Sequence, residues 1–256
     1  MKKLIRGILA VSAMAAALAL TGCDKKNGTT TGGDTTFAGE YRMEAKPLYS
    51  EMEAKDPIEM EGMNMTYAQI IAALFSLTQS ADLGGTSDIT FQPDGSMVIV
   101  FDDPEDGTVT LLPNEAEGIP ADAITYALNG SNVIFTLSSE TIDNMLDAAT
   151  DPQEAAAIKQ LLAGFNKGIF TYSAADNTAK VTFKYKLTET ELTLYIDKGM
   201  ISETWSAGKA IMNGILALVG EDNPEIAAIL TAVIPQVDTM LEGFNKIEVG
   251  AKMTRK

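Results

Sequence analysis

The sequence contains no histidine and a single cysteine in 256 residues. The lack of histidine excludes His-based catalytic triads, His metal sites and His acid–base catalysis. One cysteine cannot build a disulfide framework, so an exported domain of this sequence depends on burial of apolar surface for its stability. These absences remove a large share of enzyme classes. We therefore expect a protein that is not an enzyme and that carries no cofactor and no metal.

The single cysteine, Cys23, stands at the end of an apolar segment. Three basic residues among the first six precede a small and apolar stretch that ends at Leu20, which is the layout of a secretory signal. The Leu-Thr-Gly-Cys sequence that follows resembles the bacterial lipobox, in which the thiol is acylated and the chain is cut before it. Several acyl chains anchor a protein stably, at roughly 0.8 kcal/mol per buried methylene. We interpret residues 1–22 as a lipoprotein signal peptide and Cys23 as the lipidation site.

Acidic side chains outnumber basic ones, 35 to 19, which gives a formal net charge of −16. Cleavage before Cys23 removes three basic residues and no acidic one, so the mature chain has 16 basic against 35 acidic side chains and a charge of −19. Such a chain repels nucleic acid and anionic lipid head groups. We therefore expect no nucleic-acid partner. The bilayer is an expected partner because of the acyl chains on Cys23, not because of the charge. We expect a cell-envelope protein in the outer membrane, with the periplasmic or the surface leaflet left open.

Residues 23–36 are rich in threonine and glycine and have almost no apolar side chain. This composition is typical of a flexible linker, so we interpret the segment as a tether. Within it, Asp34-Thr35-Thr36 fits the short Asp-Thr-x pattern that Bacteroidetes use for O-glycosylation, and Thr35 is the candidate acceptor. Asp238-Thr239-Met240 fits the same pattern, but it lies in a predicted helix, which argues against Thr239.

Beyond the tether, apolar and polar residues alternate. The alternation begins at Tyr41 and Met43 and returns near the end of the chain between Ile247 and Met253, which predicts antiparallel strands with one solvent-facing side. Hairpins are predicted around Pro93-Asp94-Gly95 and around Asn129-Gly130, and further strands lie between residues 168 and 197.

Helices are predicted over residues 151–167 and 223–246, because each stretch begins with an Asx-Pro pair and continues with an apolar stripe. The second is expected to bend at Pro235, and a further helix is expected near residues 67–80. A hairpin, a Ser-Glu-Thr triplet, a helix, a Gly-Phe-Asn-Lys sequence and a strand recur in this order around residues 126–173 and 185–250. Either a unit was duplicated or the topology requires similar local sequences, and the shared order favours duplication.

The strand that begins Gly39-Glu40-Tyr41, the hairpin of residues 89–97 and the strand pair of residues 185–195 resemble the lipocalin-like lipoproteins of Bacteroidetes, many of which have no assigned function. Lipocalins open their first strand with Gly-x-Trp, whereas Tyr41 stands here in place of the tryptophan. The resemblance implies an α+β fold over residues 37–256: an antiparallel meander β-barrel of eight or more strands with long helical insertions. It also implies an apolar interior that is open at one end.

We therefore interpret the chain as a membrane-anchored lipoprotein that binds a small apolar or amphipathic ligand in a barrel pocket. The candidate ligand-binding residues are aromatic side chains on the expected inward faces, joined by the only tryptophan, and the alternative role of each is plain core packing. They are Tyr41, Phe91, Phe101, Tyr126, Phe135, Phe183, Tyr185 and Trp205. The alternative function is a structural or interaction lipoprotein whose helices, residues 204–245, plug the barrel and dock a protein partner.

Three further motifs have simpler explanations. Ser206-Ala-Gly-Lys209 matches the Ser-x-x-Lys of penicillin-binding enzymes, but the accompanying boxes of those enzymes are missing. Residues 102–107, Asp-Asp-Pro-Glu-Asp-Gly, suggest calcium, but proline occupies a ligand position of the EF-hand loop, which favours a solvated turn. The methionines between Met60 and Met65 have thioether spacing that suits Cu(I), and they equally suit flexible apolar cover.

Replacing the cysteine tests the anchor. We expect Cys23→Ala to leave the protein soluble or uncleaved, because the acylated thiol is the expected anchor and the mature chain has no run of 18 apolar residues. Cell fractionation followed by immunoblotting measures both processing and membrane partition. A variant that is processed normally and still partitions with membranes would contradict the lipobox interpretation.

Overall fold

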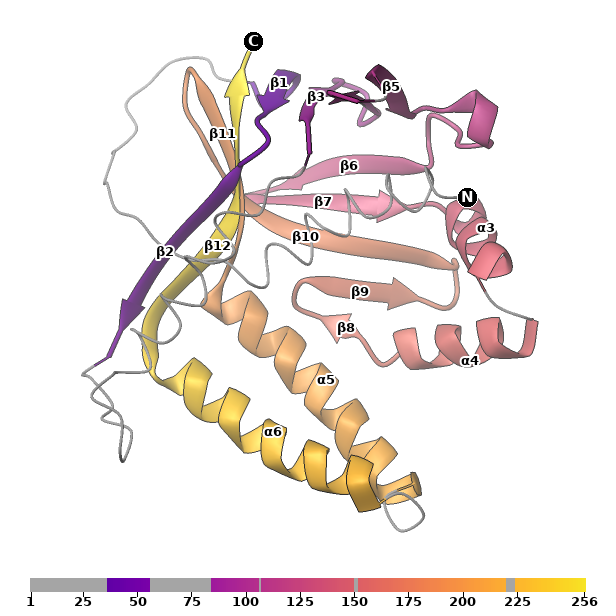
Figure 1. Ribbon diagram of the computed structural model, residues 1–256, viewed down its shortest axis with the longest axis vertical. Helices are drawn as coiled ribbons and strands as arrows, with labels where there is room; N and C mark the ends of the chain where they lie inside the picture. Colours follow the sequence, from indigo (N-terminus) through magenta and orange to yellow (C-terminus); the bar gives the residue numbers. More distant parts are fainter. Residues whose placement is uncertain (1–35, 56–83, 106, 150–151, 220–223) are drawn as a thin grey trace.

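The computed structural model describes residues 36–55, 84–105, 107–149, 152–219 and 224–256. Several expectations fall outside these residues: the signal peptide, the lipidation of Cys23, the tether up to residue 35 with the glycosylation of Thr35, the helix near residues 67–80, and the methionines between Met60 and Met65. The described part is dominated by one twelve-stranded sheet in which every strand pair is antiparallel (Figure 1). This confirms the prediction of an antiparallel β-rich fold.

The strands are β1 (Gly39–Met43), β2 (Leu48–Ala54), β3 (Thr86–Phe91), β4 (Met97–Asp103), β5 (Gly107–Leu112), β6 (Ile124–Asn129), β7 (Asn132–Leu137), β8 (Asn166–Lys167), β9 (Phe170–Ser173), β10 (Thr178–Leu187), β11 (Glu191–Asp197) and β12 (Phe244–Arg255). They pair in the order β5-β4-β3-β1-β12-β11-β10-β7-β6, with β2 beside β12 and β8-β9 beside β10. Most neighbours in this order are also neighbours in sequence, as in a meander.

The hairpins form where turn residues interrupt the alternation. In the β3–β4 turn, the Gly95 N–H donates to Gln92 O at 3.1 Å, and Gly95 has a φ of 89°, which glycine adopts without strain. In the β6–β7 hairpin, Asn129 pairs with Asn132, so the two loop residues are Gly130 and Ser131. The loop therefore lies one position later than the expected Asn129-Gly130, with the glycine at its first position.

Among the described strands, the sheet does not close into a barrel by strand pairing. Its two ends there are β5, which pairs with β4, and β6, which pairs with β7. A backbone hydrogen bond of 2.8 Å from the Tyr126 N–H to Gly95 O joins β6 to the β3–β4 turn. The antiparallel sheet that was expected is thus present, but between β5 and β6 its described strands do not close into the expected barrel.

Helices α3 (Ser139–Ala149), α4 (Pro152–Leu162), α5 (Lys198–Val219) and α6 (Pro224–Glu242) complete the described elements, together with a short 3₁₀ turn at Glu115–Glu117. Helix α4 and helix α6 begin at the prolines of the two Asx-Pro pairs, as expected, and α6 contains Pro235. Both stretches of the proposed repeat have the same order of elements: a hairpin, two helices and a returning strand. In the described part of the chain, no helix is both long enough and apolar enough to cross a membrane.

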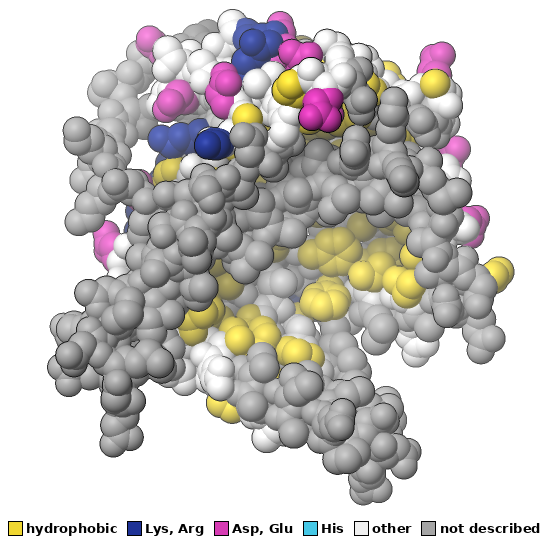
Figure 2. Space-filling view, in the orientation of Figure 1, with side chains coloured by type: hydrophobic (Ala, Val, Ile, Leu, Met, Phe, Trp, Pro, Cys, Tyr) yellow, Lys and Arg dark blue, Asp and Glu magenta, His cyan; other side chains and the backbone are white. Residues whose placement is uncertain are grey.

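Helices α5 and α6 form a hairpin that leaves one end of the sheet and projects away from it (Figure 1). The described contacts lie at its base, where Thr204 Oγ1 accepts the Ile169 N–H at 2.7 Å and Leu241 is buried. Figure 2 shows charged side chains around the upper part of the molecule and apolar side chains in the lower half of the same face, near this hairpin.

A glycine in the middle of β12 allows close packing of the sheet. Gly250 lies between Tyr49 of β2 and Tyr195 of β11 in the ladder, and a Cβ at this position would lie 1.9 Å from Leu194 O. Backbone atoms cannot move away without breaking strand pairs, so any side chain here forces β11 and β12 apart.

We expect Gly250→Ala to lower the free energy of unfolding by about 2–4 kcal/mol, through steric overlap inside the sheet. The matched control is Gly208→Ala in α5, where the nearest atom to an added Cβ is Phe165 Cε1 at 3.7 Å. There the better helix propensity of alanine should leave the protein as stable or more stable by about 0.5–1 kcal/mol. Urea unfolding measures both, and equal stability of the two variants would contradict this account of the sheet.

Candidate functional site

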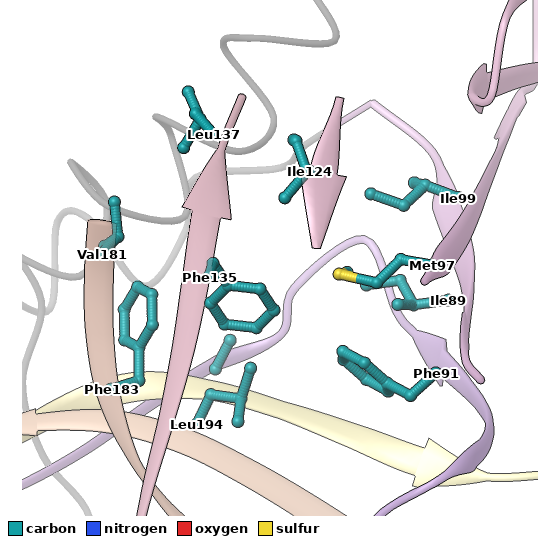
Figure 3. A pocket seen from close by; sticks show the side chains of 11 residues that line it. Ile89, Phe91, Met97, Ile99, Ile124, Phe135, Leu137, Val181, Phe183 and Leu194 are labelled. Carbon is teal, nitrogen blue, oxygen red and sulfur yellow. The ribbon is translucent and has the colours of Figure 1, made fainter. Parts of the chain in front are cut away.

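The interior of the sheet contains a small apolar cavity of about 30 Å³ (Figure 3). Side chains from strands β3, β4, β6, β7, β10, β11 and β12 line it. They are Ile89, Phe91, Met97, Ile99, Ile124, Phe135, Leu137, Val181, Phe183, Leu194 and Ala251. Ligand pockets usually measure several hundred Å³, whereas 30 Å³ is close to the space of a single water molecule. The described interior is therefore packed as core.

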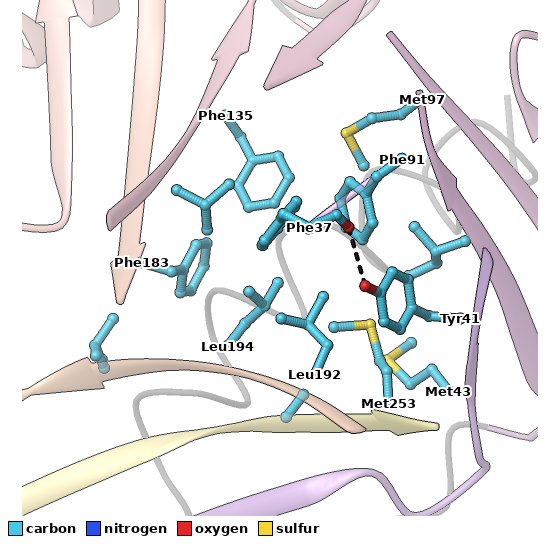
Figure 4. Close-up of a cluster of buried hydrophobic side chains, with 14 of the residues drawn as sticks. Phe37, Tyr41, Met43, Phe91, Met97, Phe135, Phe183, Leu192, Leu194 and Met253 are labelled. Carbon is cyan, nitrogen blue, oxygen red and sulfur yellow. Dashed lines mark hydrogen bonds between the residues drawn. The ribbon is translucent and has the colours of Figure 1, made fainter. Parts of the chain in front are cut away.

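Aromatic and aliphatic side chains together fill the rest of the interior (Figure 4). Phe37, the residue just before β1 that also borders the end of the sheet, is 5% exposed. Its ring centroid lies 4.9 Å from that of Phe91, 5.1 Å from that of Tyr185 and 5.4 Å from that of Tyr126. The Tyr41 hydroxyl donates to Phe37 O at 3.0 Å and holds this residue in place. Phe37 is not among the candidate residues predicted from the sequence, although its position as the first large apolar residue after the tether is a usable signal.

The structure brings six of the eight candidate aromatic residues into this core. Four of them, Tyr41, Phe91, Phe135 and Phe183, are buried, and two, Tyr126 and Tyr185, are half-buried at its edge. Phe101 is half-buried near the far end of β4 and does not belong to the cluster. Trp205 packs against the cluster from α5.

A larger concave site lies at the end of the sheet, on the outer side of Phe37. This depression, which we call the cup, measures about 720 Å³ and is lined by Thr36, Phe37, Ala38, Pro93, Asp94, Gly95, Tyr126, Ala127, Leu128, Tyr185 and Leu187. Leu128 is the large apolar side chain that is exposed in the described part of the chain, at 46%. The lining of the cup is mixed, because aromatic and aliphatic side chains lie beside a carboxylate, a hydroxyl and backbone groups.

The strand ends explain why the cup has this composition. Leu128 follows Tyr126 by two positions on β6, and Leu187 follows Tyr185 by two positions on β10, so each pair shares one face of its strand. The first member of each pair packs on the Phe37 ring, and the second also lines the cup. Leu128 is exposed there, whereas Leu187 is half-buried against the core. Alternation alone could have identified Leu128 and Leu187, but not which strand ends meet.

The outer face of the sheet carries a polar cluster of a different kind. Lys186 Nζ donates to the Tyr49 hydroxyl at 2.7 Å and to Glu248 Oε2 at 2.5 Å, and it lies over the rings of Tyr49 and Tyr195. Burial, followed by the hydrogen bond to Glu248, raises the pKa of Tyr49 well above its ordinary value. Each of these polar groups has a partner, so the cluster acts as a brace that connects β2, β10, β11 and β12.

The base of the α5–α6 hairpin is held by one carboxylate. Asp238 Oδ1 accepts the Trp205 indole N–H at 2.7 Å and a hydrogen bond from Lys209 Nζ at 2.8 Å. Lys209 is therefore paired with Asp238, while Ser206 is exposed on α5. This arrangement gives no support to Ser-x-x-Lys chemistry at this position.

Asp102 and Asp103 are the last residues of β4, and Gly107 is the first residue of β5. Between the two strand ends, Thr108 Oγ1 donates to Asp102 Oδ1 at 3.0 Å. Within the described ranges, no group of three or more Asp, Glu, Cys or His side chains is arranged to hold a metal ion. Comparison of the chain with family models, curated proteins and solved structures finds no match.

Acid should loosen the base of the hairpin. The hydrogen bonds from Lys209 and Trp205 lower the pKa of Asp238 below its ordinary value. A carboxylate with a lowered folded-state pKa stabilises the fold above its unfolded pKa, and this contribution is lost as the pH falls through the folded value. We therefore expect Trp205 emission to change below about pH 4.

Asp238→Asn is the matched variant, because it keeps the size of the side chain and removes its charge. It should be less stable than the parent chain at neutral pH, and its Trp205 emission should lack the acid transition. Fluorescence and circular dichroism, recorded on both proteins, measure the two effects. The same acid transition in both proteins would mean that Asp238 does not control it.

Proposed function

We propose that the protein is a lipid-anchored envelope lipoprotein that binds a small amphipathic molecule in the cup. The observation that carries this proposal is the cup itself, whose volume of about 720 Å³ lies in the range of small-molecule sites. Its aromatic and aliphatic lining suits the apolar part of a ligand, and its rim of polar groups suits a head group. The proposal moves the expected ligand from the centre of the barrel to its end.

The path of the chain supports a position of the cup near the membrane. Thr36 lines the cup, and only residues 24–35 separate it from Cys23. A chain of this length spans at most roughly 45 Å when fully extended. With Cys23 acylated, the cup therefore stays within that distance of the bilayer, where amphipathic molecules concentrate.

The proposal includes a lipocalin-like barrel as the framework of the site. Three observations support a barrel that is interrupted between β5 and β6. They are the antiparallel order of the strands, the pairing of β1 with β12, and the backbone hydrogen bond from Tyr126 to Gly95. The resemblance to lipocalin-like lipoproteins of Bacteroidetes and the outer-membrane location belong to the same proposal.

Binding of a neutral fluorescent probe tests the function. We expect N-phenyl-1-naphthylamine to bind residues 24–256 with a micromolar Kd, about −8 kcal/mol, because apolar rings and aliphatic groups are exposed in the cup. Leu128→Asn should weaken this binding about tenfold, because it replaces the exposed apolar side chain of the cup by a polar one of similar size. Fluorescence titration gives both constants.

Val181→Thr is the control, because Val181 lines the small interior cavity and not the cup. It should leave the affinity for the probe unchanged. If Val181→Thr weakens binding and Leu128→Asn does not, the ligand enters the interior rather than the cup. Mass spectrometry of molecules that co-purify with the protein from its native host would then identify the natural ligand.

The second candidate function is an interaction lipoprotein, in which the α5–α6 hairpin docks a protein partner. The supporting observation is that the hairpin is joined to the sheet through its base and projects from it (Figure 1). A folded protein that binds neither the neutral probe nor any co-purified small molecule would favour this second function.

A further inference from the structure

The lining of the cup contains one ionised side chain, Asp94, and neither lysine nor arginine among the residues described there. Asp94 Oδ1 accepts hydrogen bonds from the Ser96 hydroxyl at 2.7 Å and from the Ser96 N–H at 2.9 Å. These bonds lower the pKa of Asp94 below its ordinary value, so the carboxylate is charged at neutral pH. Its other oxygen, Oδ2, has no hydrogen-bond partner in the described part of the chain.

An aromatic ring is attached to the same turn. The Tyr126 N–H donates to Gly95 O at 2.8 Å, and the Tyr126 hydroxyl donates to Gln92 O at 2.6 Å. Tyr126 is therefore hydrogen-bonded to residues of the turn that precede and follow Asp94. Burial raises the pKa of Tyr126, and the charge of Asp94 raises it further, so the carboxylate and the phenol interact electrostatically.

Gly95 makes this arrangement possible. A Cβ at Gly95 would lie 2.8 Å from Tyr126 O, so a residue without a side chain is needed for β6 to approach the turn so closely. The turn and the strand end thus hold a carboxylate and a tyrosine at one wall of the cup. The rest of the lining is largely apolar and includes Phe37, Tyr185 and Leu187 together with the exposed Leu128.

A carboxylate beside aromatic rings attracts a positively charged group in two ways. The carboxylate forms an ion pair, and the faces of tyrosine and phenylalanine rings attract cations through their quadrupoles. An anionic head group, in contrast, would face Asp94 without a compensating basic side chain in the lining. The net charge of −16 of the chain acts in the same direction.

We propose that the cup selects amphipathic molecules with an ammonium group: the ammonium lies against Asp94 and the ring of Tyr126, and the hydrocarbon part lies on Leu128, Tyr185 and Leu187. This inference rests on the proposed function, because it names the class of ligand for the same site. It adds a charge preference that the volume and apolar lining of the cup do not require.

Two amphiphiles of equal chain length and opposite charge test the preference. Decyltrimethylammonium and decanoate are titrated into residues 24–256 below their critical micelle concentrations, in 150 mM salt so that distant charges are screened. Their affinities are read from displacement of N-phenyl-1-naphthylamine and from calorimetry. We expect the cation to bind at least tenfold more tightly than the anion.

Asp94→Asn should reduce the affinity for decyltrimethylammonium about tenfold and leave the affinity for the neutral probe unchanged. Asparagine can accept the same hydrogen bonds from Ser96, so the turn is retained. The matched control is Glu140→Gln on α3, which removes one exposed negative charge that does not line the cup. It should leave the ratio of the two affinities as in the parent chain.

The outcomes separate this inference from the function on which it rests. If the neutral probe does not bind, the proposed function fails. If the neutral probe binds through Leu128 but the two amphiphiles bind equally, the function stands and the charge preference is overturned. An equal loss of affinity in Asp94→Asn and Glu140→Gln also overturns it, because the preference then reflects net charge and not the cup.

Discussion

The structure depends on the pairing of strand β12 with strands from both ends of the chain. Along one edge, β12 pairs with β2 and then with β1, and along the other edge it pairs with β11. Beyond the strand, the Lys256 N–H donates to Glu40 O at 2.9 Å, and its side chain pairs with Glu40 and Asp88. The contacts of β12 with β1 and β2 join residues from near the two ends of the chain, and they place the residue that follows the tether at the end of the sheet.

This placement positions Phe37. Once β1 pairs with β12, the preceding residues run across the end of the sheet, and the Phe37 ring inserts among Phe91, Tyr126 and Tyr185. The ring separates the interior into a packed core with a small residual cavity and the open cup. A chain without disulfides needs a well-filled core, because burial of apolar surface is its main source of stability. The packed core leaves little open space in the described interior, and the ligand site that we propose lies at the end of the sheet, in the cup.

The outer face and the hairpin are stabilised by ion pairs instead. Lys186 and Glu248 brace the face of the sheet on which Gly250 leaves room for two tyrosine rings, Tyr49 and Tyr195. Asp238 connects α5 and α6 at their base. Because these pairs are partly exposed, each contributes modestly, and their main effect is to set the geometry of β2 and of the hairpin.

The sequence by itself determined the local features of this protein. Alternation with a period of two identifies the inward faces that carry Tyr41, Phe91, Phe135 and Phe183, and Pro152 and Pro224 mark helix starts, because these signals depend only on neighbours along the chain. The lipid anchor at Cys23 and the glycosylation site at Thr35 lie outside the described residues and remain predictions from the sequence.

Only the tertiary structure decided which inward-facing side chains are core and which are exposed. Tyr126 and Leu128 share a face of β6, yet Tyr126 packs on Phe37 and Leu128 lies in the cup. It also decided that β5 and β6 do not pair, although both alternate like the other strands. The physical reason is that the exposure of a side chain and the closure of the sheet depend on which strand ends meet in space. These meetings are set by pairings between residues far apart in the chain, such as Tyr41 with Arg255, and no local pattern in the sequence specifies them.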